Sequence, residues 1–305
     1  MNQTWCRKKM VVSAILWLFL SSSMPQAFAK TDLKAMRAKI EALIQQSGAE
    51  IVGVAFYDLK TGDELLMNPD ESLHAASTMK VPVMLELYRQ AAAKKFSLDD
   101  QIEIKNDFVS IADGSHFSIG KDDDSEPTLY KRIGEKETIR ELMRLMIVMS
   151  SNLATNILIE RVDAKNVMKT MREMGAKNIQ VLRGVEDNKA FERKMNNTTT
   201  ARDLMIILRR IAEGRAVSRQ ASDEMIQVLL TQHFNEGIPA GVSRDAKVAH
   251  KTGSITRIYH DAAIVFPKGR KPYVLVVLTR GFADGKQAHR LVADISKVVY
   301  DSTVK

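Results

Sequence analysis

The chain contains almost none of the residues that cross-link small exported domains. Its single cysteine, Cys6, and its only tryptophans, Trp5 and Trp17, all lie near the amino terminus. One cysteine cannot form an intramolecular disulfide, so the fold must be stabilised by its hydrophobic core. With 305 residues, 45% of them hydrophobic, the chain can bury one large core or two modest ones.

Other absences exclude whole classes of function. The sequence has no glycine-rich nucleotide loop, and no basic run with interleaved aromatic residues of the kind that binds nucleic acid. Its 6 histidines lack the paired spacing of metal ligands. The acidic run at residues 122–126 lacks the ligand spacing of a calcium loop, and we interpret it as solvated surface. We therefore expect no metal, no other cofactor and no nucleic-acid partner.

Residues 1–29 have the layout of a secretory signal peptide. Met1 to Lys9 is basic, Met10 to Leu20 is apolar, and Ala27-Phe28-Ala29 is a small-x-small cleavage pattern. The apolar part is too short to span a bilayer comfortably, and no later stretch is apolar for long enough. We expect a mature domain at residues 30–305 that is periplasmic or secreted, monomeric and without a membrane span.

Hydrophobic periodicity predicts strands at both ends of the mature domain. Strands from the two ends can pair into one antiparallel sheet that is flanked by the terminal helices. The expected elements are a helix at 32–46, strands at 50–59 and 64–67, strands at 260–266 and 273–279, and a helix at 285–300.

The segment between these ends is expected to be helical. Thr138 and Thr200 begin capping boxes, and Ser222 is expected to head a further helix. We therefore predict an α/β fold of the α+β type, with a sheet lobe at about 30–69 and 241–305 and an all-helical lobe at about 70–240. A cleft between two lobes is a common place for a small-molecule site.

A polar cluster opens the apolar run at residues 74–90. Ser77 and Lys80 are spaced i, i+3, so they share one helix face, and a desolvated lysine can act as the base for a serine nucleophile. Ser-x-x-Lys occurs three times in the chain, but only the copy at Ser77 begins a strongly apolar helix. The structural alternative is that Ser77 caps the helix while Lys80 extends its amine to solvent.

Two further motifs carry polar groups. Lys251-Thr252-Gly253 lies on an expected strand edge, where the first two residues could hold a carboxylate and the glycine permits close approach to the backbone. Ser150 and Asn152 stand where one helix stops and the next begins, a place that helix caps also occupy. Each motif alone is more typical of structure than of catalysis.

Together, the three motifs resemble those of class A β-lactamases and penicillin-binding proteins. The resemblance covers nearly the whole mature chain, and the chain length favours the class A β-lactamase branch. It implies that Ser77 is acylated, that Lys80 takes or relays its proton, and that Ser150 passes a proton to the leaving nitrogen. The implied substrate-binding groups are Asn152 for the amide side chain, Lys251 and Thr252 for the carboxylate, Gly253 beside them, and the backbone N–H groups of Ser77 and Ser254 for the oxyanion.

The loop that should carry the deacylating glutamate departs from the family pattern. Glu186 precedes the Asn-Thr-Thr-Thr run as expected, but the family spacing would require asparagine where Ala190 stands. Asn188 is present two positions early, and Glu192 fits the spacing but lies close to the end of the loop. We favour Glu186, with Asn188 as a helper, and keep Glu192 as the alternative.

Two other departures concern loop structure. Ser151 replaces a family aspartate that braces the loop without touching the reacting bond, and segment 108–134 is longer than the family needs. The expected activity is hydrolysis of a β-lactam through an acyl-enzyme. The alternatives are a peptidoglycan DD-peptidase or esterase-like serine hydrolase, and a penicillin-binding protein that does not deacylate, because shared motifs do not fix the specificity of the pocket.

Overall fold

The computed structural model describes residues 1–3 and 31–304, and from Thr31 onward the chain forms one compact unit. The predicted signal peptide at 1–29 falls almost wholly on residues 4–30, outside the described part of the chain. Within the described residues, no helix is long and apolar enough to cross a membrane.

The strands from the two ends of the chain form one five-stranded antiparallel sheet, as predicted. Its order is β2-β1-β11-β10-β9, so the first strand of the chain pairs with the last, from Ile51 opposite Arg280 to Asp58 opposite Tyr273. The strands are β1 (Ile51–Asp58), β2 (Glu64–Met67), β9 (Lys247–Ile255), β10 (Ile258–Phe266) and β11 (Tyr273–Arg280).

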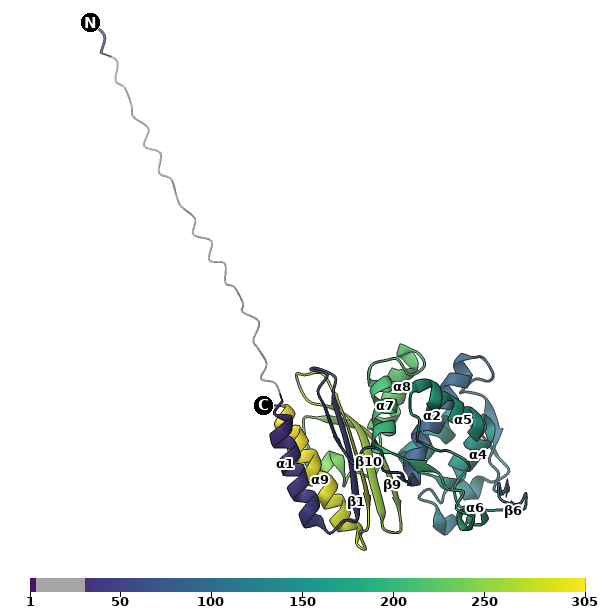
Figure 1. The fold of residues 1–305 in the computed structure, drawn as a ribbon. Helices are drawn as coiled ribbons and strands as arrows, with labels where there is room; N and C mark the ends of the chain where they lie inside the picture. The colour runs from purple at the N-terminus through teal and green to yellow at the C-terminus, as the bar shows by residue number, and fades with distance from the viewer. Residues whose placement is uncertain (4–30, 305) are drawn as a thin grey trace. The chain divides into compact units, whose positions relative to one another are not determined.

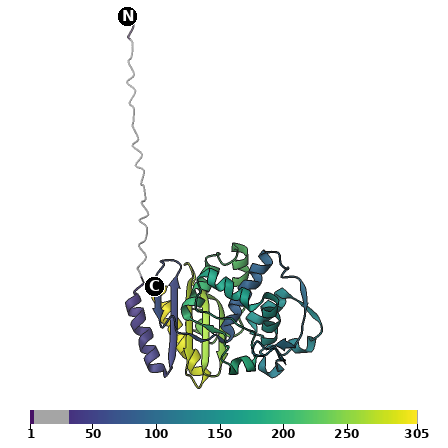
Figure 2. The same cartoon turned by 45° about the vertical axis from the view of Figure 1, so that its right-hand side comes forward.

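The sheet separates two hydrophobic cores. Along β10, Ala263 and Val265 face one core while Ala262 and Ile264 face the other, because successive side chains of a strand point to opposite faces. The terminal helices α1 (Leu33–Ser47) and α9 (Gly285–Thr303) lie side by side on the first face (Figure 1). Figure 2 shows the helical part of the compact unit on the opposite face.

The middle of the chain is mostly helical, and two of its predicted helix starts are confirmed. The Thr138 hydroxyl accepts from the Glu141 N–H and the Thr200 hydroxyl from the Asp203 N–H, each at 3.1 Å. The helices are α2 (Lys80–Ala92), α3 (Ile139–Val148), α4 (Asn152–Val162), α5 (Ala164–Met174), α6 (Asn188–Glu192), α7 (Ala201–Ala212) and α8 (Arg219–Leu230).

The predicted start of a helix at Ser222 is wrong. Helix α8 begins at Arg219, because Ser218 is the capping residue and accepts from the Ala221 N–H at 3.1 Å. Ser222 lies inside the helix and is fully buried. Both serines are plausible caps by residue type, and the burial of one helix face decided between them.

The region predicted to be all-helical also contains short strand pairs. Strands of two or three residues are too short to show the alternation that identifies a strand in a sequence. The pairs are β3 (Leu73–His74) with β8 (Thr198–Thr199), β4 (Gln101–Glu103) with β7 (Lys136–Thr138), and β5 (Phe108–Val109) with β6 (His116–Phe117).

Candidate active site

Ser77 lies in a tight turn, the 3-10 helix η1 (Ala76–Met79), which leads directly into α2. Neither η1 nor α2 has a side-chain cap, so Ser77 does not serve as an N-cap. Ala76, just before it, has φ +45°, and its N–H donates to Nδ1 of His74 at 3.0 Å. Such left-handed backbone at a non-glycine residue costs free energy and is held only by its surroundings.

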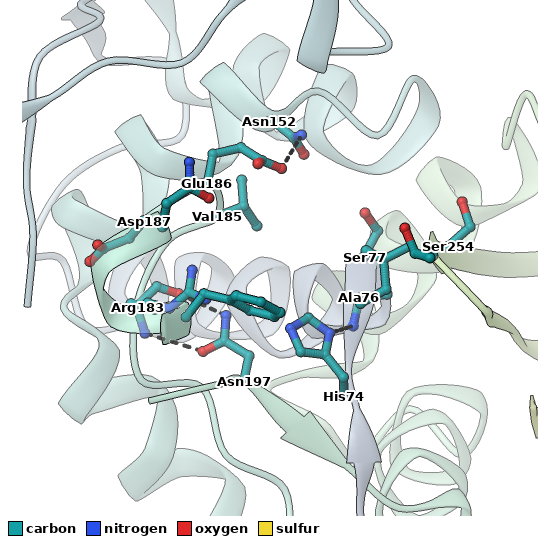
Figure 3. Close-up of a pocket in the computed structure, with 14 residues that line it drawn as sticks. His74, Ala76, Ser77, Asn152, Arg183, Val185, Glu186, Asp187, Asn197 and Ser254 are labelled. Carbon is teal, nitrogen blue, oxygen red and sulfur yellow. Dashed lines mark hydrogen bonds between the residues drawn. The ribbon is translucent and has the colours of Figure 1, made fainter. Parts of the chain in front are cut away.

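Ser77 faces a cavity that is divided into two parts of about 320 and 290 Å³. Four residues line both parts: Ser77, Asn152, Glu186 and Ser254. Figure 3 shows Ser77 and Ser254 next to each other on one wall, with Glu186 and Asn152 on the wall opposite. The structure therefore brings the three motifs together at one cavity, as predicted, and adds Glu186 from a fourth part of the sequence.

Lys80 is fully buried, and its amine points to the turn between α3 and α4. Nζ donates to the Ser150 carbonyl oxygen at 2.7 Å, to Ser150 Oγ at 3.2 Å and to Asn152 Oδ1 at 2.9 Å. Burial lowers the pKa of Lys80 to about 7, against the opposing charges of Asp124 and Glu186. A lowered pKa favours the neutral amine, the state that a base requires.

Ser150 stands between two buried lysines. Nζ of Lys251, on the edge strand β9, donates to Ser150 Oγ at 3.1 Å and to the Thr252 carbonyl at 2.9 Å. Burial and the charge of Lys80 hold the pKa of Lys251 well below its usual value. Ser150 itself has φ +58°, so its turn is a second strained point in the site.

Gly253, in the Lys-Thr-Gly motif, was expected to permit close approach to the backbone, and it is also required for packing. A Cβ at Gly253 would lie 3.0 Å from the backbone nitrogens of both Ser77 and Thr78. The absence of a side chain therefore lets β9 lie directly against η1. This contact puts the N–H of Ser77 close to the strand that carries Ser254, the second expected oxyanion donor.

The loop that bears Glu186 is fastened at several points. Asn197 closes it by accepting from the Leu182 N–H at 2.8 Å and donating to the Arg183 carbonyl at 3.0 Å. The Asn156 side chain accepts from the Val185 N–H at 2.7 Å and donates to its carbonyl at 3.0 Å. These bonds fix the backbone immediately before Glu186.

Glu186 projects into the cavity from a residue with φ +58°. Its Oε1 accepts from Asn152 Nδ2 at 3.3 Å (Figure 3). Partial burial, and then the nearby Asp123 carboxylate, raise the pKa of Glu186. A carboxylate with a raised pKa is a better base toward water than an ordinary surface acid.

The proposed helper Asn188 and the alternative acid Glu192 lie in different places. Asn188 lines the same part of the cavity as Glu186, whereas Ala190 is fully buried and offers no polar group. Glu192 is exposed at the end of α6 and lies outside the linings of both parts of the cavity.

The interpretation of residues 122–126 as solvated surface is wrong for Asp124. Asp122 and Asp123 are exposed, but Asp124 is only 9% exposed and its carboxylate accepts from Ser151 Oγ at 3.2 Å. The sequence carries no pattern that predicts this contact, because Asp124 and Ser151 lie 27 positions apart in the chain. Within the described residues, no group of three or more metal-ligating side chains is gathered.

Comparisons with known proteins place this geometry in a family. The sequence pattern of the Beta-lactamase enzyme family matches residues 35–303. The β-lactamase Toho-1 of Escherichia coli is 25% identical over 305 residues, which cover 98% of each chain. The solved structure of the ancestral class A β-lactamase GNCA is 25% identical, with a TM-score of 0.75 over 87% of this chain and 99% of its own.

A third comparison is with a variant of PBP-A, solved as an acyl-enzyme complex with penicillin G. It is 22% identical, with a TM-score of 0.75 over 89% of this chain and 97% of its own, and it supports the fold alone. Fold and site define a serine hydrolase of the class A type. The chain belongs to the β-lactamase enzyme family.

Proposed function

We propose that this protein hydrolyses β-lactams through an acyl-enzyme on Ser77. The observation that carries the proposal is the position of the Ser150 hydroxyl, within hydrogen-bond distance of both Lys80 and Lys251. A proton that Lys80 takes up can therefore pass to Ser150 and from there to a leaving nitrogen. General acid–base catalysis needs such a short path between groups with suitable pKa values.

In the proposed acylation, Ser77 Oγ attacks the β-lactam carbonyl while its proton moves to Lys80. The backbone N–H groups of Ser77 and Ser254 stabilise the oxyanion, which is the largest contribution in many acyl transfers. The carbon–nitrogen bond breaks as Ser150 protonates the nitrogen. The product is an ester of Ser77 with the ring opened.

The substrate is oriented by groups on either side of Ser77. Thr252 on β9, which lines the second part of the cavity, binds the carboxylate of the β-lactam, and the neighbouring Lys251 assists it from its buried position. Asn152, across the cavity, binds the amide side chain. Deacylation follows when Glu186, assisted by Asn188, activates a water that attacks the ester.

A second candidate is a penicillin-binding protein that acylates and does not deacylate. It is favoured by the buried Ala190 at the position of the family asparagine, and by the bond of Glu186 to Asn152 in place of a partner in its own loop. A DD-peptidase or esterase would use the same acylation machinery on another substrate.

We also propose that the protein is exported, with cleavage after Ala29, and acts as a periplasmic or secreted monomer. The support is the order of basic, apolar and small residues in the sequence.

The experiment that tests the function is turnover of benzylpenicillin, followed by its ultraviolet absorbance, with the Ser77→Ala variant as the control. We expect multiple turnovers by the native enzyme and a loss of at least about 1000-fold in the variant, because the nucleophile is absent. Turnover that survives Ser77→Ala would remove the nucleophile assignment.

A further inference from the structure

The long segment between α2 and α3 reaches into the active site at one buried acid. Asp124 is only 9% exposed, although it stands in a run of acidic residues, and its Oδ2 receives three donors. The Leu153 N–H donates at 2.7 Å, the Ser151 hydroxyl at 3.2 Å and the Tyr130 hydroxyl at 3.1 Å. Its other oxygen accepts from the Glu126 N–H at 2.9 Å.

Two of these donors belong to the start of α4, which is the turn that carries the catalytic groups. Ser151 lies between Ser150 and Asn152, and Leu153 follows them directly. Both Ser150 and Asn152 bond to the amine of Lys80. Asp124 therefore holds the residues on both sides of Asn152, Ser151 by its hydroxyl and Leu153 by its backbone N–H. Asp124 itself is not among the residues that line the cavity.

The strain in the turn makes an external brace necessary. Ser150 has φ +58°, a conformation that a serine adopts only when its surroundings enforce it. The Leu153 N–H belongs to the first turn of α4, where no carbonyl of the helix itself can accept from it. A buried carboxylate satisfies this donor and suits the positive end of the helix dipole.

We propose that Asp124 is a positioning residue that sets the Ser150–Asn152 turn for acylation, in place of an acid at position 151. The carboxylate comes from segment 108–134, so this longer loop is part of the catalytic scaffold. The proposal rests on the proposed function, because it assigns Asp124 to the acylation step at Ser77.

The test is the rate at which benzylpenicillin forms a covalent adduct, measured by rapid quench and intact mass. Asp124→Ala leaves the Leu153 N–H and the Ser151 hydroxyl unpaired, and we expect acylation to slow roughly 10- to 100-fold. The matched control is Asp122→Ala, which removes the same charge from an exposed position two residues away and should acylate at the native rate.

Rescue separates positioning from general stability. The double variant Asp124→Ala, Ser151→Asp returns a carboxylate to the turn itself, and we expect it to recover most of the lost rate. If Asp124→Ala fails to fold, Asp124→Asn takes its place. The amide oxygen of Asn can still accept one of the hydrogen bonds, so we expect an intermediate rate of acylation. The melting temperature is recorded for every variant.

Three results would overturn the proposal. Asp124→Ala or Asp124→Asn could acylate as fast as Asp122→Ala, which would make the carboxylate dispensable. The double variant could fold and remain as slow as Asp124→Ala, which would mean that a carboxylate at the turn is not what acylation needs. If the native enzyme forms no adduct, the proposed function fails and this inference fails with it.

Discussion

At the scale of single residues, the site depends on two buried lysines that share one serine hydroxyl. Lys80 and Lys251 are both fully buried, and both donate to Ser150 Oγ. Burying two ammonium groups so close together is unfavourable, so the pKa values of both lysines are lowered. Under the proposed function, the same arrangement that costs folding free energy supplies the base that acylation of Ser77 requires.

The placement of single residues was predictable where a motif fixed it. Ser77, Lys80, Ser150 and Lys251 fall together as the resemblance implies, because their spacing places them on elements that the fold brings to one cavity. Asp124 was not predictable in this way. Its role depends on a contact between residues 27 positions apart, through a loop without a recognisable pattern.

The first prediction concerns which glutamate deacylates. Glu186→Gln should still form the penicillin adduct but should lengthen its lifetime by at least about 100-fold, because an amide cannot take a proton from water. The lifetime is measured by intact mass after removal of excess drug. Glu192→Gln is the matched control, since Glu192 is exposed outside the cavity linings, and it should clear the adduct at the native rate.

The opposite pattern, with a long-lived adduct in Glu192→Gln and normal clearance in Glu186→Gln, would assign deacylation to Glu192 instead of Glu186. If the adduct of the native enzyme already persists, the penicillin-binding candidate gains support over hydrolysis.

At the scale of elements, the short hairpin of β5 and β6 fastens the loop that carries Glu186. Asp187, the next residue, is buried and accepts from the Ser110 hydroxyl at 2.8 Å and from the Ile111 N–H at 3.0 Å. Asp187 also caps α6 by accepting from the Ala190 N–H at 3.1 Å. The backbone of Glu186 is therefore held from the hairpin side as well as by Asn156.

This contact predicts an effect on one step of the reaction only. Ser110→Ala removes a buried hydrogen bond to a carboxylate, worth about 1.5–3 kcal/mol, and should slow deacylation by roughly 10-fold while leaving acylation unchanged. Single-turnover mass spectrometry separates the two rates. Ser115→Ala is the control, because Ser115 contacts Lys189 at an exposed site that contributes little.

An equal loss in both steps, or no loss in either, would contradict the assignment of the hairpin to the Glu186 loop. The hairpin itself was not predictable, because strands of two residues carry no periodic signal. The pairing of strands from the two chain ends and the terminal helices were predictable, because these segments are long enough for their hydrophobic pattern to be recognised.

At the scale of the whole molecule, His260 connects the sheet to the segment that leads into η1, the turn that carries Ser77. The Thr279 N–H of β11 donates to His260 Nδ1 at 3.1 Å, so the proton of the neutral ring is on Nε2, which donates to the His74 carbonyl at 2.9 Å. His74 in turn accepts from the Ala76 N–H, next to Ser77. Burial lowers the pKa of His260 from 6.5 to about 4.

A lowered histidine pKa makes the folded state sensitive to acid. Between pH 6.5 and 4 the unfolded chain binds a proton at this histidine and the folded chain does not, so stability falls as the pH falls through this window. The full shift corresponds to about 3 kcal/mol of unfolding free energy. Urea denaturation at pH 7, 5.5 and 4 measures this loss.

The side chain in the variant His260→Gln does not titrate. The free energy of unfolding of this variant should therefore fall by about 3 kcal/mol less than that of the native protein between pH 7 and 4. The control His233→Gln changes an exposed ring and should keep the native slope. A native slope in His260→Gln would mean that other groups account for the acid sensitivity.

The measurement that tests the central claim most directly is the intact mass of the mature protein, followed over time after mixing with excess benzylpenicillin. We expect the mass of one opened penicillin to appear on the protein, to be absent in Ser77→Ala, and to clear as the drug is consumed. If no adduct appears on the native protein and the drug is not consumed, the site does not acylate with β-lactams, and the proposed function is contradicted.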